Sequence, residues 1–240
     1  FRDVKVRQAL LHAIDRKSLN QAVYGQYAIT LNIPQAPISW LYDDEGMETY
    51  DYDLEKAAEL LKEAGWEKDG DKLMKDGKQM KIVFSAMSGN VVTDTMIPLM
   101  IDAYGQLGID FQAEYVDWPT LQSKSQNGTF DMLFMAWGLT ADPDLTGTFA
   151  SAEAGGTQNR TGYANPELDK MLAEALASTS KEEQKEKYKE IYKLINEELP
   201  LYPIYERCDM ICYNTRVQNI EQSSYVKWYQ QDKIVNIEVE

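Results

Sequence analysis

The chain carries Tyr50-Asp-Tyr-Asp-Leu-Glu-Lys-Ala-Ala-Glu-Leu-Leu-Lys-Glu-Ala-Gly-Trp66 and, after a short charged gap, Leu73-Met-Lys-Asp-Gly-Lys-Gln-Met80. Asp53 stands where an N-cap oxygen accepts from a free backbone N–H, and Gly65 stands where a helix ends. Between them lies an apolar stripe made of Leu54, Ala57, Ala58 and Leu61. Asp76-Gly77 tolerates positive φ, which a two-residue hairpin turn requires. The segment is therefore predicted to form a helix, a loop anchored by the tryptophan, and a tight hairpin.

Helices and strands are predicted to alternate along the rest of the chain. Helical spacing or a helix-start signal marks 4–13, a short helix ending near 25, 93–107, a helix starting at 118–119, 165–177 and 181–198. Strands are predicted at 80–86, 109–115 and 201–213, and an ordered loop at 30–48. Ile101 and Tyr115 are expected on buried faces of their elements. The pattern predicts one α/β lobe, with a mixed β-sheet flanked by helices, and a separate tail.

Two further segments give more specific expectations. The run from Phe130 to Trp137 is almost unbroken in its apolar character, which predicts a strand covered on both faces in the middle of the sheet. Cys208 and Cys212 lie four residues apart, so a straight strand would hold them on one side but too far apart for a disulfide. We interpret them as small apolar residues that face a core.

Composition excludes several classes of partner. The net charge is −15, without a basic cluster to offset it, and this opposes contact with nucleic acid or anionic lipid. Hydrophobic residues make up 44% of the 240 positions, enough for one substantial core. No apolar run approaches the length that a membrane span requires. Most of the charges are interpreted as a solvated surface.

Catalysis finds little support in the residues. His12 is the only histidine, and it stands within an amphipathic helix, so a Ser-His-Asp or Cys-His set would depend on that one ring. There is no Gly-rich phosphate loop before a helix and no His or Cys cluster with metal-ligand spacing. Asp142-Pro143-Asp144 is better explained as a turn in which Asp144 caps the next segment than as a cation site. We expect no enzyme activity, no cofactor and no metal.

Three stretches in the same order and spacing resemble one known family: Phe1 to Arg16, Tyr50 to Trp66, and Asn165 to Leu172. They are similar to the oligopeptide- and dipeptide-binding proteins that feed ABC importers, the extracellular solute-binding protein family 5. The resemblance covers nearly the whole chain and fades after about Tyr213. It implies the second, C-terminal lobe of a two-lobe receptor of the type II periplasmic-binding-protein class. Residues 1–212 would form that lobe, and 213–240 a tail that returns to a first lobe preceding residue 1.

The resemblance also implies a ligand site. The strand matching 130–137 ends at the cleft in this family, so Trp137, Gly138, Leu139 and Thr140 are expected in the cleft wall. Members that clamp the peptide amino end carry an aspartate where this chain has Thr140, which leaves amine clamping open; Asp142 or Asp144 could substitute. Asn159 and Tyr163 resemble an element near the cleft. A loop held by their own hydrogen bonds explains these two residues about equally well.

The expected function is a receptor that binds peptides between two lobes and delivers them to the transmembrane subunits of an ABC permease. A recognition site can be made from backbone groups, aromatic side chains and a few charges. We expect a monomer, located outside the cytoplasm as a cell-surface lipoprotein or a periplasmic protein, on the resemblance alone. Two alternatives stay open: a receptor for a metal chelate, sugar or other non-peptide solute on the same scaffold, and a surface sensor or adhesin.

Overall fold

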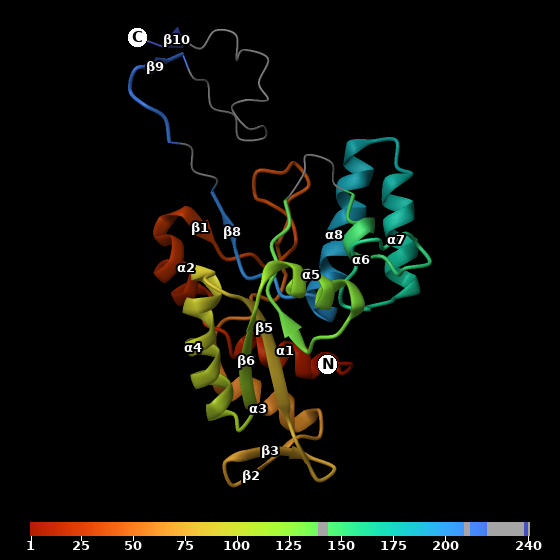
Figure 1. Cartoon of the computed structure of the whole chain (residues 1–240). Coiled ribbons are helices and arrows are strands. Elements are labelled where there is room, and N and C mark those ends of the chain that lie inside the picture. The colour runs from red at the N-terminus through yellow and green to blue at the C-terminus, as the bar shows by residue number, and fades with distance from the viewer. Residues whose placement is uncertain (139–143, 209–211, 220–237, 240) are drawn as a thin grey trace.

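The computed structural model of the chain describes residues 1–138, 144–208, 212–219 and 238–239. They form an α/β protein, as predicted (Figure 1). A parallel sheet with helices around it forms one part of the molecule, and three helices form the part beside it.

The N-terminal elements are α1 (Val4–His12), α2 (Arg16–Tyr24), the 3-10 helix η1 (Gly25–Tyr27) and β1 (Ala28–Ile29). Aspartate caps both helices: Asp3 accepts from the backbone N–H of Lys5 at 2.9 Å, and Asp15 accepts from that of Ser18 at 2.9 Å. Residues 30–53 contain no helix or strand, which confirms the predicted loop.

The segment of residues 50–80 folds as predicted. It forms α3 (Leu54–Glu63), β2 (Glu67–Asp69), β3 (Lys72–Lys75) and β4 (Lys78–Gln79). Asp53 accepts from the N–H of Lys56 at 2.8 Å and caps α3. Asp76 (φ 51°) and Gly77 (φ 72°) form the two-residue turn that joins β3 to β4. One detail is wrong: Ala58 is exposed, and Leu60 takes its place on the buried stripe.

The parallel sheet has the strand order β6-β5-β7. Its elements are β5 (Lys81–Met87), α4 (Val91–Gln106), β6 (Asp110–Val116), α5 (Trp118–Asn127) and β7 (Met132–Leu133). Phe84 and Ala86 of β5 are buried, and α4 packs on β6. Ile101 and Tyr115 are exposed, contrary to expectation, because helix and strand are covered on one side only.

The prediction for 130–137 is wrong in extent and in position. Only Met132–Leu133 pairs, and β7 lies at an edge of the sheet because it bonds to β5 alone. Phe134 leaves the sheet and stacks on Tyr205, with ring centroids 6.1 Å apart. The apolar run therefore has two causes: pairing of a strand and contact of Phe134 with another aromatic side chain. The periodicity of a sequence cannot distinguish these two causes.

The helical part contains α6 (Thr146–Phe149), α7 (Pro166–Leu176) and α8 (Lys181–Glu198). Asn165 and Ser180 cap the two longer helices as acceptors from Glu167 and Glu183. The buried residues form two hydrophobic clusters. One contains residues of the parallel sheet and the helices packed on it, and the other contains the buried tyrosines Tyr188 and Tyr192. The chain thus buries two clusters where composition suggested one core.

The C-terminal strands are short. They are β8 (Glu206–Arg207), which pairs antiparallel with β1, and β9 (Val217–Gln218), which pairs with β10 (Glu238–Val239). The predicted strand over 201–213 therefore shrinks to two residues among those described. Cys208 and Cys212 are both exposed and free, so the interpretation that they face a core is wrong. Beyond β8 the chain leaves the body of the molecule, which removes the packing that would bury them (Figure 1).

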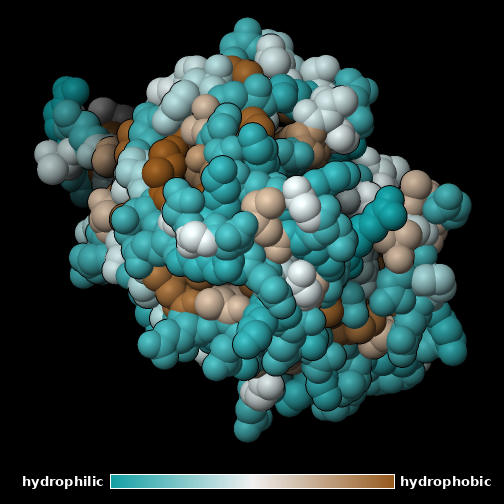
Figure 2. Space-filling model, turned by 90° about the horizontal axis from the view of Figure 1, so that it is seen from below, coloured by the Kyte–Doolittle hydropathy of each residue, from teal (hydrophilic) through white to brown (hydrophobic). Residues whose placement is uncertain are grey.

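The face at the amino ends of β5 and β6 is largely hydrophilic, with scattered apolar side chains (Figure 2). This agrees with the solvated surface expected from the charge pattern. Within the described residues, no helix combines the length and the apolar character needed to cross a bilayer.

Candidate functional site

The carboxyl ends of β5, β6 and β7 lie at one edge of the sheet, because the three strands are parallel. In open α/β sheets, ligands bind in the crevice outside this edge. Two polar side chains here serve as helix caps: Asn90 accepts from Val92 at 3.0 Å, and Asp117 accepts from Thr120 at 2.9 Å. Hydrogen bonds from Thr120 also lower the pKa of Asp117.

Two tryptophans at this edge stay accessible. Trp137, four residues past the end of β7, is 42% exposed, and Trp118, at the start of α5, is 49% exposed. Gly138 is exposed as well. A wide apolar ring with one polar N–H suits a ligand surface. The indole predicted to line the cleft is therefore accessible to a ligand. Trp118 is accessible as well; its ring suits a ligand surface, but packing is the more common role of such rings, so the sequence did not place it in the site.

Three predicted site residues, Leu139, Thr140 and Asp142, lie outside the described residues. Asp144 follows them and accepts a hydrogen bond from the backbone N–H of Thr146 at 2.8 Å. Asp144 therefore bonds to the first residue of α6, as the predicted turn requires, but the N-cap position itself is held by Leu145.

Asn159 and Tyr163 hold their own loop together. The Asn159 amide donates to the carbonyls of Ala150 at 2.9 Å and Tyr163 at 2.8 Å, and its Oδ1 accepts from Thr161. The Tyr163 hydroxyl accepts from Asn165 at 3.0 Å, and burial raises its pKa. Their polar groups are already engaged, so the loop-stapling explanation accounts for both side chains.

An aromatic group supports the segment that leads to Trp137. Phe134 stacks on Tyr205, and Tyr24 of α2 also contacts Tyr205, with ring centroids 5.0 Å apart. The two tyrosine hydroxyls are 3.1 Å apart. Burial, followed by the hydrogen bond to Tyr24, raises the pKa of Tyr205, so the Tyr205 hydroxyl stays protonated at neutral pH. Three distant segments meet here, which is why the sequence did not indicate the group.

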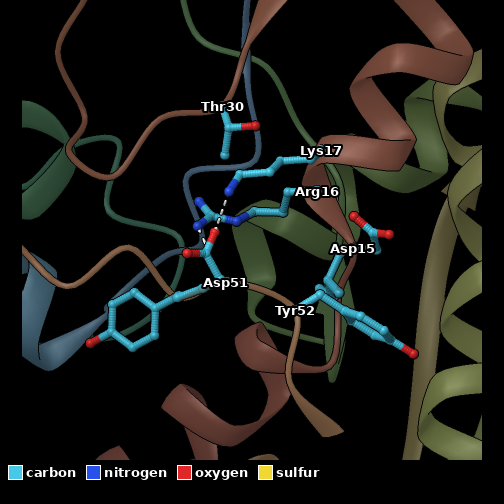
Figure 3. A pocket seen from close by; sticks show the side chains of 8 residues that line it. Asp15, Arg16, Lys17, Thr30, Asp51 and Tyr52 are labelled. Carbon is cyan, nitrogen blue, oxygen red and sulfur yellow. Dashed lines mark hydrogen bonds and ion pairs between the residues drawn. The ribbon is translucent and has the colours of Figure 1, made fainter.

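A cavity of about 210 Å³ lies beside Arg16 (Figure 3). Its guanidinium, 3% exposed, donates to the carbonyls of Leu31 at 2.5 Å and Pro203 at 2.7 Å, and also to those of Thr49 and Tyr50. Desolvation lowers its pKa to about 10. Arg16 thus ties the 30–53 loop and the segment before β8 to α2. Its donors serve the fold and leave little for a ligand.

The same cavity has a charged rim. Lys17 binds Asp51 at 2.6 Å, and Figure 3 shows both basic side chains converging on that carboxylate. His12 lies nearby in the fold, with Nδ1 2.8 Å from the Asp51 carbonyl and its ring against Tyr50. Across the described ranges, no three His, Cys, Asp or Glu residues are placed to hold a metal ion.

Comparison with known proteins identifies the family. The model of the bacterial extracellular solute-binding proteins, family 5, middle part, matches residues 1–159. The chain belongs to this family. Family 5 consists of binding proteins, not enzymes.

Among family 5 relatives, the oligopeptide-binding protein AppA of Bacillus subtilis is 30% identical over 85% of this chain and 39% of its own length. Heme-binding protein A of Haemophilus influenzae is 29% identical over 94% of this chain and 40% of its own length. The chain thus spans about two fifths of the curated relatives that it matches.

Solved structures agree with the assignment. AppA of B. subtilis in complex with a nonapeptide has a TM-score of 0.81 at 30% identity, over 86% of this chain and 42% of that one. NikZ of Campylobacter jejuni in complex with Ni(L-His) has a TM-score of 0.79 at 26% identity, over 91% of this chain and 44% of that one. Two structures that hold different kinds of ligand thus resemble the backbone of this chain to a similar degree.

Proposed function

We propose that this chain is the second lobe of a solute-binding receptor of an ABC importer, and that the receptor binds peptides in a cleft between two lobes. Residues 1–212 form the lobe, and 213–240 return toward the first lobe. The observation that carries the proposal is the exposed Trp137 at the carboxyl edge of the parallel sheet. A large indole costs free energy when it stays in water, and a ligand that covers it recovers that energy.

Peptide suits this edge better than a reactive substrate. The accessible groups described there include two indoles, and the amide of Asn90 and the carboxylate of Asp117 are engaged as helix caps. Main-chain hydrogen bonds hold an extended peptide without regard to its side chains, while aromatic faces accept varied apolar groups. The oligopeptide-binding relatives support this choice. Trp137, Gly138, Leu139, Thr140 and Asp142 form the proposed wall, with Asn159 and Tyr163 holding the loop behind it.

A second candidate is a receptor for a non-peptide solute. It is favoured by relatives named for haem and nickel and by the Ni(L-His) complex. In that case the cleft would take a chelate as a whole, since the described residues offer no cluster of metal-ligating side chains.

The receptor would work outside the cytoplasm and hand its ligand to the transmembrane subunits of the permease. Closure of two lobes on the ligand removes water from both faces of it at once. One lobe alone forfeits half of the contacts. Calorimetry with a mixture of random tripeptides to nonapeptides should therefore show far weaker binding to residues 1–240 than to the receptor with both lobes. Equal affinity would contradict the two-lobe mechanism.

The direct test is Trp137→Ala in the two-lobe receptor, with Tyr52→Ala as control. Tyr52 is 45% exposed, like Trp137, but it lies near Asp102. Asp102 belongs to the C-terminal half of α4, so Tyr52 is away from the carboxyl edge of the sheet. Loss of a central aromatic contact typically costs about 1–3 kcal/mol, so Trp137→Ala should weaken binding of the peptide mixture about tenfold or more. Tyr52→Ala should leave it unchanged. Equal effects of the two variants would overturn the proposed site.

A further inference from the structure

A second cavity, of about 350 Å³, lies between the two hydrophobic clusters of the chain. It is lined by α1, α3, α8 and the loop of residues 46–50, and by none of the residues proposed for the cleft wall. Tyr50 and Leu60 of its lining belong to the cluster that contains the sheet, and Met47 packs against the other cluster. In Figure 1, the lower end of α8 lies beside α1, and α3 lies below α1. The volume is at the small end of the range for ligand sites, about 300–1,000 Å³.

His12 offers this cavity a hydrogen-bond acceptor that nothing in the fold uses. The side chain lines the cavity but is only 8% exposed, and its Nδ1 lies 2.8 Å from the carbonyl oxygen of Asp51. A carbonyl oxygen can only accept, so Nδ1 carries the hydrogen, and Nε2 of the neutral ring is an acceptor. No described residue bonds to Nε2, and Nε2 is not one of the fully shielded polar atoms. Because the ring is nearly buried, the cavity is the space that Nε2 can reach.

Two carboxylates lie near the same part of the cavity. The Tyr50 ring is 5.2 Å from the His12 ring, and the charges of Glu48 and Glu197 both act on Tyr50. Burial is the main cause that raises the pKa of Tyr50 to about 12, and these two charges raise it further. The Tyr50 hydroxyl therefore stays protonated, and it donates to the Asn196 carbonyl at 2.8 Å. The groups left for a ligand in this part of the cavity are acceptors: His12 Nε2 and the two carboxylates.

Two ammonium groups line the cavity as well. Lys56 belongs to α3 and Lys193 to α8. Lys56 approaches Glu59 of its own helix at 3.8 Å, a long and exposed contact. Lys193 and Glu197 are four residues apart on α8, yet neither forms an ion pair with any residue that the structure describes, although other lysines of this helix do so. Both lysines thus have donors to offer a ligand.

The cavity therefore presents acceptors and cations together, beside an apolar wall formed by Met47 and Leu60. Groups of opposite charge that share a small cavity without pairing are complementary to a molecule that carries both charges. We propose that this cavity binds a free α-amino acid with an apolar side chain. The ammonium group of the amino acid donates to His12 Nε2 and to the two carboxylates, and its carboxylate accepts from the two lysines. This site is independent of the proposed peptide cleft.

Calorimetry on the ligand-free receptor with both lobes tests the class of ligand. The probes are L-leucine, N-acetyl-leucine, which has no ammonium group, and leucinamide, which has no carboxylate. Each blocked probe loses charge-assisted hydrogen bonds, so leucine should bind about tenfold or more tightly than either of them. Equal binding of the three probes, or no binding of leucine at millimolar concentration, would overturn the inference.

Two variants test the place of binding. Lys193→Gln removes a cation from the cavity, and His12→Asn keeps a donor for the Asp51 carbonyl but removes the acceptor at Nε2. Each should weaken leucine binding about tenfold. Lys185→Gln, at an exposed lysine of the same helix that does not line the cavity, is the matched control and should leave it unchanged. Equal effects of Lys193→Gln and Lys185→Gln would overturn the inference.

A stability measurement covers the case in which His12→Asn does not fold. Lys193 is exposed, so Lys193→Gln should have the Tm of the unaltered receptor when no ligand is present. Leucine should raise the Tm of the unaltered receptor, because a ligand that binds only the folded state stabilises it, and should raise that of Lys193→Gln less. The same increase in both proteins would contradict the site.

Trp137→Ala separates this cavity from the cleft. Leucine binding should survive in Trp137→Ala, whereas binding of the peptide mixture should survive in Lys193→Gln. Leucine binding that is lost in Trp137→Ala and kept in Lys193→Gln would place the amino acid in the cleft and overturn the inference. Failure of the peptide proposal is measured with the peptide mixture and the unaltered receptor, so the two failures are distinguishable.

Discussion

Replacement of Arg16 by methionine should destabilise the protein strongly. The guanidinium is buried and donates to four backbone carbonyls from the loop of residues 31–50 and from Pro203. A hydrogen bond from a charged donor is worth about 1.5–3 kcal/mol, and a buried acceptor left without a partner costs about 1–3 kcal/mol. Such losses are not additive, and methionine restores part of the packing. The expected loss in free energy of unfolding is about 3–5 kcal/mol.

Lys17→Met is the matched control for this experiment. Lys17 is the next residue and also pairs with a carboxylate, but its side chain is 74% exposed and that of Asp51 is 58% exposed. Exposed ion pairs contribute about 0–1 kcal/mol, so this variant should unfold close to the unaltered protein. Urea unfolding followed by circular dichroism measures both. A loss below about 1 kcal/mol for Arg16→Met, or equal losses for the two variants, would refute this account of Arg16.

Three further predictions concern stability. Gly108→Ala should cost about 2–4 kcal/mol, because φ is +84° and the new Cβ would lie 2.8 Å from a backbone nitrogen of β3; Gly105→Ala, with open space in α4, should gain about 0.5–1 kcal/mol. Thermal unfolding that ranks them in the opposite order would contradict the packing. Asn196→Leu should cost about 2–4 kcal/mol in urea, since the buried amide makes three hydrogen bonds of 2.9–3.0 Å to backbone of the 30–48 loop; an unchanged midpoint would contradict it. The Lys124 ammonium, followed by a serine hydroxyl, lowers the pKa of Glu114, so its contribution is present at neutral pH and is lost as pH falls below about 4. In Glu114→Gln, the free energy of unfolding should therefore fall less between neutral and acid pH, by under about 1 kcal/mol. An unchanged pH dependence of stability would contradict the pairing with Lys124.

Features with a local cause were predictable from the sequence. A cap needs one acceptor at the right offset, and a primed turn needs two residues that accept positive φ. Asp53 and Asp76-Gly77 meet these needs within their own segment, and the structure places them as predicted. Asp144 also bonds to the backbone of the segment after it, one residue before the N-cap of α6.

Features that depend on distant segments were not predictable. The sequence around Arg16 indicates only the start of a helix. Its four carbonyl partners come from residues 31, 49, 50 and 203, which meet it only in the folded chain. Within the run from Phe130 to Trp137, Met132–Leu133 pairs with β5, but Phe134 packs on Tyr205, some seventy residues later, and this contact cannot be seen in the local pattern.

The most direct test of the central claim is the identity of the natural solute. The receptor with both lobes is purified without added ligand, the bound molecule is released by mild denaturation, and mass spectrometry identifies it. If the exposed indole edge holds peptides without converting them, the released species should be intact short peptides of mixed sequence, and incubation of fresh peptide with the receptor should return it unchanged. A haem, a metal chelate or a sugar, or cleaved peptide after incubation, would contradict the account.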